Sequence, residues 1–348
     1  MSRSFPTIWP DRNIPVLCLL MILCCWLPTH AAAQPLPGRE PPPASAPIRA
    51  QLVKRFLSIG TASINGAYYP LGTAMARLFN AKLGEILVIS EPTNGSVDNV
   101  RYLQSRDIAL ALVQNDVAWE AFTGRGNFDG KPFAELRVLA SLYSEVVHVA
   151  VRKDAEIRTF RELKGKVIAI GEAGSGTAIN ARIILDAAGL KEGDYTPSYL
   201  SFTKATDALE SRYIDAVFFT GGIPLEGFAL LGQKMPLRLL PFSEELRGRL
   251  VTGYSFLERE TIPSGTYSGQ DEEISTVGLR ALLVTTAEFE PELAERMLHL
   301  LFQNIGYLTS ICKTAEALTL RSALKGVDPK MLHPGAERFY KECRVLER

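Results

Sequence analysis

The stretch "VIAIGEAGSGTAINARIIL", Val167–Leu185, combines a short apolar strand, a glycine-rich turn and an amphipathic helix. Gly171 and Gly176 stand where a phosphate-binding Walker A loop keeps its glycines. Thr177 and Ala178 replace the lysine and the serine or threonine that would reach phosphates and magnesium. A helix start offers unpaired N–H groups and a partial positive charge, which attract an anion without any lysine. We therefore expect this turn to bind a carboxylate.

Strand-like and helix-like segments alternate along the rest of the chain. "FLSIG", "ILVIS" and "IALALVQ" each precede a helical segment, and "VIAIG", "SYLSF" and "IDAVFFTG" do so again. This alternation predicts two series of parallel strands with crossover helices. The segments Leu103–Gln114 and Leu209–Thr220 align without gaps at the third strand of each series, sharing Leu, Ser, Arg and Ile. This likeness favours two structurally similar lobes.

Two β-prone runs are predicted to connect the lobes. "LRVLASLYSEVVHVAVRK" lies between the two series, and "VGLRALLVTT", Val277–Thr286, provides a return crossing. Two crossings indicate a hinge and a cleft that closes on a ligand. We expect an α/β protein with a two-lobe, periplasmic-binding-protein type II fold, each lobe a mostly parallel sheet with flanking helices. The predicted boundaries are a signal peptide at 1–33, a proline-rich tether at 34–54, lobe 1 at 55–145 and 255–348, and lobe 2 at 146–254.

The N-terminus has the features of a secretory signal. Arg3 and Arg12 precede the apolar run "VLCLLMILCCWL", and a small-residue triplet follows, so we expect cleavage after Ala33 and a periplasmic protein. The run is shorter than the roughly 20 apolar residues of a spanning helix. Lipidation at Cys24 is an alternative, although the bulky Leu23 disfavours it.

Composition excludes several classes of protein. The 348 residues carry 38 Lys+Arg against 38 Asp+Glu, so there is no basic excess with which to bind nucleic acid. The predicted exported chain keeps Cys312 and Cys343, which either form a disulfide or stay as buried thiols. There is no CxxC motif and no Cys/His cluster, so we expect no metal site and no cofactor.

Enzyme motifs are also missing from the sequence. Ala173 and Thr177 flank Ser175 where a nucleophile elbow has glycines. His148 lies inside a β-prone run and is interpreted as a core or hinge residue. No Ser, His and Asp stand where a catalytic set is evident. We therefore expect a binding protein rather than an enzyme.

The predicted strands end in polar loops rich in hydroxyls, amides and glycines and poor in arginine and lysine. Ligands of open α/β sheets gather beyond the carboxyl ends of strands. The alternative is that these side chains only cap helices and shape turns: Ser175 and Thr177 suit an N-cap, and Tyr68 and Tyr69 suit packing. Six polar strand ends together favour a ligand site over capping alone.

The blocks "GTASINGAYYPLG", "EPTNGSVDNVRYL", "ALVQNDVA", "LASLYSEVVHVAVR", "GEAGSGTAINA" and "LHPGAERFYKE" resemble, in this order, the TAXI family. These are extracytoplasmic solute-binding receptors of tripartite ATP-independent periplasmic (TRAP) transporters, and the likeness spans Phe56–Lys341. It implies delivery of a small carboxylate, such as glutamate, glutamine or a C4–C5 dicarboxylate like 2-oxoglutarate, to TRAP-type membrane permease subunits. The candidate ligand contacts are Thr61, Tyr68, Tyr69, Thr93, Asn94, Ser96, Gln114, Ser175, Gly176, Thr177, Asn180 and Thr220.

Two questions stay open at the level of sequence. One of the carboxylates Asp98, Asp116, Glu145 and Glu172 could meet a ligand ammonium; if none faces the cleft, a keto or hydroxy acid is favoured. The receptor could also signal to a partner protein instead of feeding a permease. We expect a monomer.

Overall fold

The computed structural model describes residues 54–347. The predicted signal peptide, its cleavage site, Cys24 and residues 34–53 of the predicted tether lie outside the described residues. Within the described part of the chain, no helix is both long enough and apolar enough to span a membrane. Cys312 and Cys343 are free thiols, so the predicted alternative of a disulfide is not realised.

Ten strands form one sheet in the order β2-β1-β3-β10-β4-β7-β5-β6, with β8 beside β4 and β9 beside β10. The strands are β1 Arg55–Gly60, β2 Ile86–Glu91, β3 Leu110–Gln114, β4 Leu136–Arg152, β5 Val167–Ala169, β6 Thr196–Ser198, β7 Ala216–Gly221, β8 Leu237–Leu239, β9 Glu258–Ile262 and β10 Ile274–Thr286.

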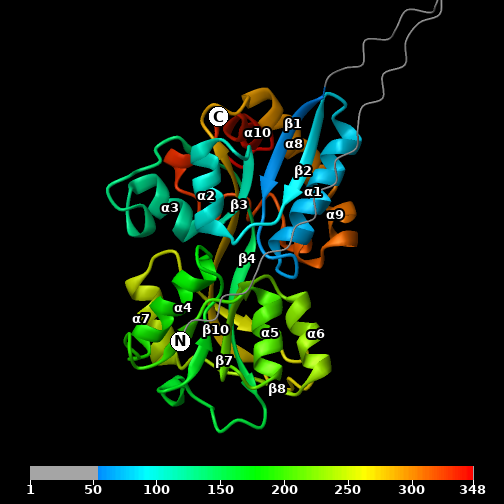
Figure 1. The fold of residues 1–348 in the computed structure, drawn as a ribbon. Helices are drawn as coiled ribbons and strands as arrows, with labels where there is room; N and C mark the ends of the chain where they lie inside the picture. The colour runs from blue at the N-terminus through cyan, green and yellow to red at the C-terminus, as the bar shows by residue number, and fades with distance from the viewer. Residues whose placement is uncertain (1–53, 348) are drawn as a thin grey trace, which may run out of the picture. The chain divides into compact units, whose positions relative to one another are not determined.

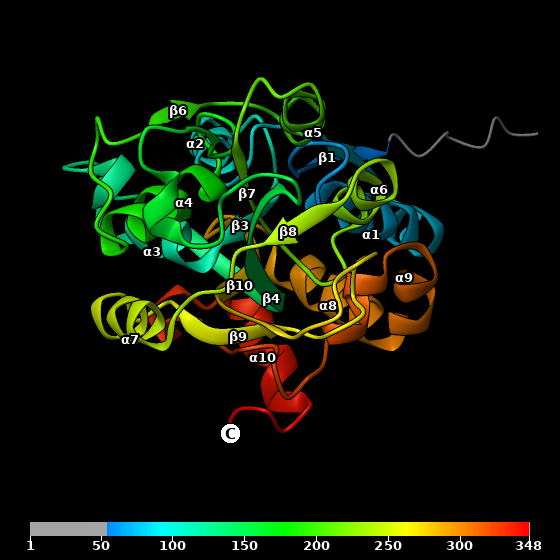
Figure 2. The same ribbon diagram turned by 90° about the horizontal axis from the view of Figure 1, so that it is seen from below.

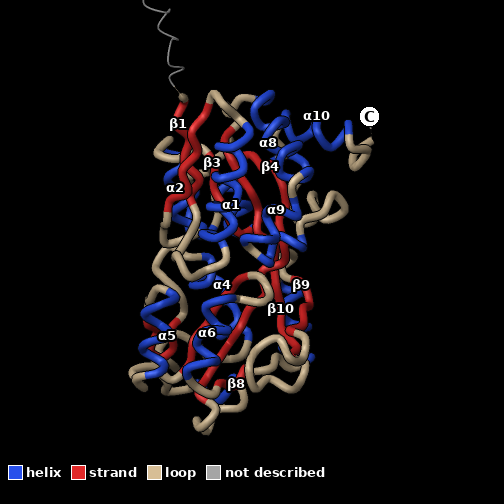
Figure 3. Tube along the Cα trace, turned by 90° about the vertical axis from the view of Figure 1, so that its right-hand side faces the viewer, coloured by secondary structure: helices blue, strands red, loops and turns tan. Residues whose placement is uncertain are grey.

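Two long strands, β4 and β10, run through both lobes, as the sequence predicts (Figures 1 and 3). The first lobe carries the parallel strands β1, β2 and β3, and the second carries the parallel strands β5, β6 and β7. β10 is antiparallel to β3 and β4, and β4 is antiparallel to β7. The two parallel sets therefore run in opposite directions, toward each other along β4.

Helices cover both faces of the sheet in each lobe, because strand side chains alternate between its two faces (Figure 2). In β3, Leu110 and Leu112 pack with α1 and α8, whereas Ala111 and Val113 pack with α2 and α3. The helices are α1 Tyr68–Lys82, α2 Ser96–Ser105, α3 Asn115–Thr123, α4 Gly176–Ala187, α5 Phe202–Glu210, α6 Glu226–Lys234, α7 Glu244–Gly253, α8 Pro291–Gln303, α9 Ile305–Ile311 and α10 Pro334–Glu342. Short 3-10 helices occupy Gly126–Phe128, Phe160–Leu163, Lys313–Ala317 and Pro329–Met331.

Candidate functional site

The carboxyl ends of the two parallel sets meet at the middle of β4. β3 ends at Gln114, which pairs with Ala281 of β10. Ala281 also pairs with Tyr143 of β4 on its other side. β7 ends at Gly221, which pairs with Val146 of β4. Glu145 therefore lies on β4 between the two strand ends, where ligands of such sheets bind.

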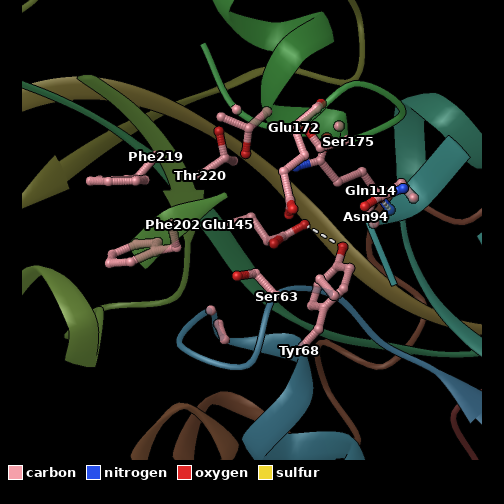
Figure 4. Close-up of a pocket in the computed structure, with 18 of the residues that line it drawn as sticks. Ser63, Tyr68, Asn94, Gln114, Glu145, Glu172, Ser175, Phe202, Phe219 and Thr220 are labelled. Atoms are coloured by element: carbon pink, nitrogen blue, oxygen red, sulfur yellow. Dashed lines mark hydrogen bonds between the residues drawn. The ribbon is translucent and has the colours of Figure 1, made fainter. Parts of the chain in front are cut away.

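A cavity of about 80 Å³ lies at this meeting point (Figure 4). That is several times the roughly 10–15 Å³ that one water needs, so a small molecule fits. Among residues 54–347, no arginine or lysine lines it. The lining residues come from both lobes: Ala62, Ser63, Gly66, Ala67, Tyr68, Asn94, Gly95, Ser96, Gln114, Glu145, Gly171, Glu172, Ser175, Gly176, Thr177, Leu200, Phe202, Phe218, Phe219, Thr220 and Leu225.

The turn before α4 brings the second lobe against the first. Gly171 and Gly174 have φ values of 95° and 86°, in the left-handed region that favours glycine. A Cβ atom at Gly174 would lie 2.7 Å from Oδ1 of Asp98 in α2, so a side chain there would hold the lobes apart. The backbone N–H of Val97 donates to the Gly174 carbonyl at 3.0 Å. The turn is therefore shaped for close approach between lobes.

The start of α4 faces the cavity with free donors. The Ser175 hydroxyl accepts from the Ala178 N–H at 3.1 Å and donates to the Glu172 carbonyl at 2.7 Å, so Ser175 is indeed an N-cap. The N–H groups of Gly176 and Thr177 have no acceptor among the described residues. Both residues line the cavity. These two donors and the helix dipole can hold one anionic group.

A buried acid occupies the centre of the cavity. Glu145 is 2% exposed, and its Oε2 accepts from the Tyr68 hydroxyl at 2.7 Å. Burial raises the pKa of Glu145 to about 8; the Tyr68 hydrogen bond opposes that rise, whereas the nearby Asp116 carboxylate adds to it. When no cation faces it, Glu145 is therefore mostly protonated at neutral pH. A cation entering the cavity would favour its ionised form.

A second acid lies near the mouth. Burial raises the pKa of Glu172, whereas the Lys204 ammonium opposes that rise. Glu172 also lines a neighbouring depression with Ser63 and Thr93, which opens to solvent. The described part of the chain contributes two acids and no lysine or arginine to this lining, so the cavity suits a ligand that carries a positive group.

Two polar atoms of the lining lack partners. Gln114 Oε1 and Thr220 Oγ1 are buried and form no hydrogen bond with any described residue. Buried polar groups in folded proteins are nearly always paired, and an unpaired one costs about 1–3 kcal/mol. Both atoms can instead bond to polar groups of a ligand.

One wall of the cavity is apolar. Phe202 stacks on Phe219 with ring centroids 3.9 Å apart, and Leu225 lies beside them in the lining. This wall fits the aliphatic part of a small ligand. It also excludes water, which strengthens the polar contacts elsewhere in the cavity.

His148 supports this wall from the core, in agreement with its interpretation from sequence. Its Nδ1–H donates to the Val146 carbonyl at 2.9 Å, and its Nε2 accepts from the Tyr267 hydroxyl at 2.8 Å. The Tyr267 oxygen in turn accepts from the Leu225 N–H at 3.0 Å. Burial lowers the pKa of His148 to about 4, so the ring stays neutral and structural.

Of the twelve candidate contacts, four lie outside the lining, and two of these, Thr61 and Thr93, stabilise loops. The Thr61 hydroxyl donates to the Glu91 carbonyl at 2.6 Å. The Thr93 hydroxyl donates to the Thr61 carbonyl at 2.8 Å or to Asn99 Oδ1 at 2.7 Å. The candidates that do line the cavity are Tyr68, Asn94, Ser96, Gln114, Ser175, Gly176, Thr177 and Thr220.

Tyr69 and Asn180 are the other two. Tyr69 follows Tyr68 in α1, about 100° further around the helix, and does not line the cavity. The Asn180 Nδ2 donates to Asp116 Oδ2 at 3.1 Å, which joins α4 to α3. The candidate list in turn omits Ser63, Glu145, Glu172, Phe202 and Phe219, which line the cavity. Glu145 and Glu172 are nevertheless two of the four acids that the sequence offers as partners of a ligand ammonium; the other two, Asp98 and Asp116, do not line the cavity.

Solved structures match this chain at low sequence identity. A protein of Bordetella bronchiseptica RB50 matches with a TM-score of 0.54 at 14% identity, covering 84% of this chain and 99% of that one. The periplasmic aliphatic sulphonate-binding protein of Escherichia coli has a TM-score of 0.46 at 17% identity, covering 84% and 94%. The alkanesulfonate-binding protein of Xanthomonas axonopodis pv. citri, bound to MOPS, has a TM-score of 0.48 at 16% identity, covering 83% and 91%.

The Bordetella likeness supports the fold alone, because identity is low. The family is shown by a separate comparison of the sequence. Residues 59–343 match the model of the NMT1-like family. The chain therefore belongs to the NMT1-like family, whose members are periplasmic solute-binding proteins and not enzymes.

Proposed function

We propose that this protein captures a small amino acid with a free carboxylate, of the glutamate or glutamine type, in the cavity between its lobes and delivers it to a membrane permease. The observation that carries the proposal is the pairing of two opposite features in one cavity. Gly176 and Thr177 offer unpaired N–H donors, and Glu145 offers a buried acid. A zwitterion complements both.

The chemistry of the lining favours an amino acid over a dicarboxylate. The α-carboxylate would sit at the start of α4, the ammonium against Glu145, and the side-chain amide or carboxyl against Gln114 or Thr220. A C4–C5 dicarboxylate such as 2-oxoglutarate would bring two uncompensated negative charges into a cavity whose lining has no arginine or lysine among the described residues, whereas the ammonium of glutamate offsets one of its two carboxylates and glutamine carries only one. Desolvating the second charge would cost several kcal/mol.

Delivery to TRAP-type permease subunits is proposed from the TAXI resemblance of the sequence blocks. In this account the protein is exported, cleaved after Ala33 and monomeric. The predicted boundary at 255 needs one correction, because Leu257, Ile262 and Tyr267 pack in the cores of the second lobe. Residues 55–145 and 280–347 would therefore move as one body and residues 146–279 as the other, with the hinge in β4 and β10. The inter-lobe bond from Val97 to Gly174 belongs to the closed state.

Calorimetry with the purified protein tests the ligand, after partial unfolding and refolding to remove any bound molecule. We expect L-glutamate or L-glutamine to bind one to one, and 2-oxoglutarate, succinate and ethanesulfonate to bind at least tenfold more weakly. This difference reflects the missing ammonium, because a charged hydrogen bond contributes about 1.5–3 kcal/mol.

Two outcomes separate the parts of the proposal. Tighter binding of 2-oxoglutarate than of either amino acid would contradict the role of Glu145 but keep a carboxylate receptor. Absence of heat from every compound would contradict the proposed ligand class altogether.

A further inference from the structure

One face of α4 packs on the opposite lobe. Ile179 belongs to an apolar cluster with Val97 of α2 and Val117 of α3, and Ile183 packs against the same cluster. These side chains lie one turn apart on α4, so they form a single contact face. Because α4 belongs to the second lobe and α2 and α3 to the first, this contact exists only when the lobes are closed.

A polar bond lies within this apolar contact. Asp116 at the start of α3 is fully buried, and Asn180 of α4 is 2% exposed. The Asn180 Nδ2 donates to Asp116 Oδ2 at 3.1 Å, while Asp116 Oδ1 accepts from the adjacent Val117 N–H at 2.7 Å. Neither Asp116 nor Asn180 lines the ligand cavity. The bond therefore joins the lobes without touching the ligand.

Burying Asp116 and Asn180 between the lobes costs free energy. A fully buried carboxylate is expensive, and burial raises the pKa of Asp116 to about 7. The Asn180 Oδ1 atom is buried without a partner among the described residues. In an open protein both groups would regain water. The bond thus adds little net free energy to closure, but losing one partner would leave the other buried and unpaired, at a cost of about 1–3 kcal/mol or more.

We propose that Asp116 and Asn180 form a closure latch that sets the rate of ligand release without contacting the ligand. This inference rests on the proposed function, because it assigns a release-controlling role to residues behind the proposed binding site. Both are positioning residues: they act on the ligand only through the closed arrangement of the lobes. An exposed bond from Asn65 Nδ2 to Thr203 Oγ1, at 2.6 Å, spans the same closure near the mouth.

Asn180→Asp is the sharpest variant, because it places two carboxylates against each other in a dry contact. Stopped-flow fluorescence of Trp119, three residues after Asp116 in α3, can follow L-glutamate association and release. We expect Asn180→Asp to raise the release rate at least tenfold and to change the association rate less than twofold. Asn180→Ala should act in the same direction, about three- to tenfold. The double variant Asp116→Asn/Asn180→Asp restores the amide–carboxylate bond in reverse and should bring release within about threefold of the wild type.

Asn80→Ala is the matched control within one lobe. The Asn80 amide bonds to the backbone of Val88 at 2.8 Å and 2.6 Å, inside the first lobe. Its loss should lower the unfolding temperature but leave the release rate unchanged. Release that quickens equally in Asn80→Ala and Asn180→Ala, or a double variant that does not recover, would overturn the latch.

A ligand-free measurement separates the latch from the proposed function. If L-glutamate does not bind the wild type, the proposed ligand is wrong, and the latch is then judged by small-angle X-ray scattering of the ligand-free proteins. We expect Asn180→Asp to increase the radius of gyration and the double variant to restore it. Identical radii in all three proteins would overturn the latch independently of the ligand.

Discussion

Replacing Glu145 by Gln is expected to weaken L-glutamate binding at least about a hundredfold. The substitution keeps the shape of the side chain and an oxygen that accepts from Tyr68, so the cavity is preserved. It removes the buried acid that would oppose a ligand ammonium at the centre of the lining. Truncating one partner of a buried charge pair costs about 2–5 kcal/mol. Calorimetry with L-glutamate measures the loss.

The pH dependence of affinity provides the control. Burial raises the pKa of Glu145 to about 8, so below that pH the binding of an ammonium must expel the proton of Glu145. Wild-type affinity should therefore rise up to tenfold per pH unit from pH 6 to 8. Burial also raises the pKa of Asp116 to about 7, and its carboxylate raises the pKa of Glu145, so the slope is measured in Asp116→Asn as well as in Glu145→Gln; the rise should persist in Asp116→Asn and be lost in Glu145→Gln. Affinity that falls over this range would mean that a protonated Glu145 donates to an anion, which contradicts the ammonium.

The same substitution should stabilise the ligand-free protein. The folded-state pKa of Glu145, about 8, lies above its ordinary value of 4.5, so the folded protein holds a proton that the unfolded chain releases between these pH values. Stability from this group is therefore present at low pH and is lost as the pH rises toward 8. Glu145→Gln should unfold at a higher temperature than the wild type at pH 8 and at a similar temperature at pH 4.

Replacing Gly176 by Ala is expected to weaken L-glutamate binding about 10- to 100-fold. A Cβ atom at Gly176 would overlap the side-chain amide of Gln114, which is buried and bounds the cavity. Either Gln114 moves into the cavity or the lobes stay apart. Overpacking of this kind costs about 1–3 kcal/mol, and here the cost falls on the closed, ligand-bound state.

Gly232→Ala is the matched control for this variant. Gly232 lies inside helix α6, and a Cβ atom there would meet nothing within 4 Å. The change should leave affinity unaltered and slightly stabilise the helix. Equal affinity in Gly176→Ala and the wild type would show that the start of α4 does not approach the first lobe as closely as the bond from Val97 to Gly174 requires.

The sequence predicts the frame of this protein because strand and helix alternation is a local, periodic signal. The two crossing runs become β4 and β10, and the glycine-rich turn becomes the start of α4. The sequence does not show which polar side chains line the cavity and which bond to the protein. Thr61 and Thr93 follow strands, and Asn180 lies in α4, yet all three side chains bond to the protein itself, whereas Gln114 at the end of β3 lines the cavity. Only the three-dimensional arrangement separates the two uses.

The position of Glu145 in the cavity also could not be predicted from local sequence. The sequence offers it only as one of four acids that could meet a ligand ammonium, and nothing local selects it from the other three. Its position follows from register: β3 and β7 must end opposite the middle of β4 before Glu145 lies between them. Asp116 and Asn180 likewise stand 64 positions apart, and only closure of the lobes brings them together.

The most direct test of the central claim is a crystal structure of the protein with L-glutamate. The account predicts a carboxylate oxygen about 2.7–3.2 Å from the backbone nitrogens of Gly176 and Thr177, with the ammonium against Glu145. A ligand carboxylate held elsewhere, with water or a protein side chain at the start of α4, would contradict it.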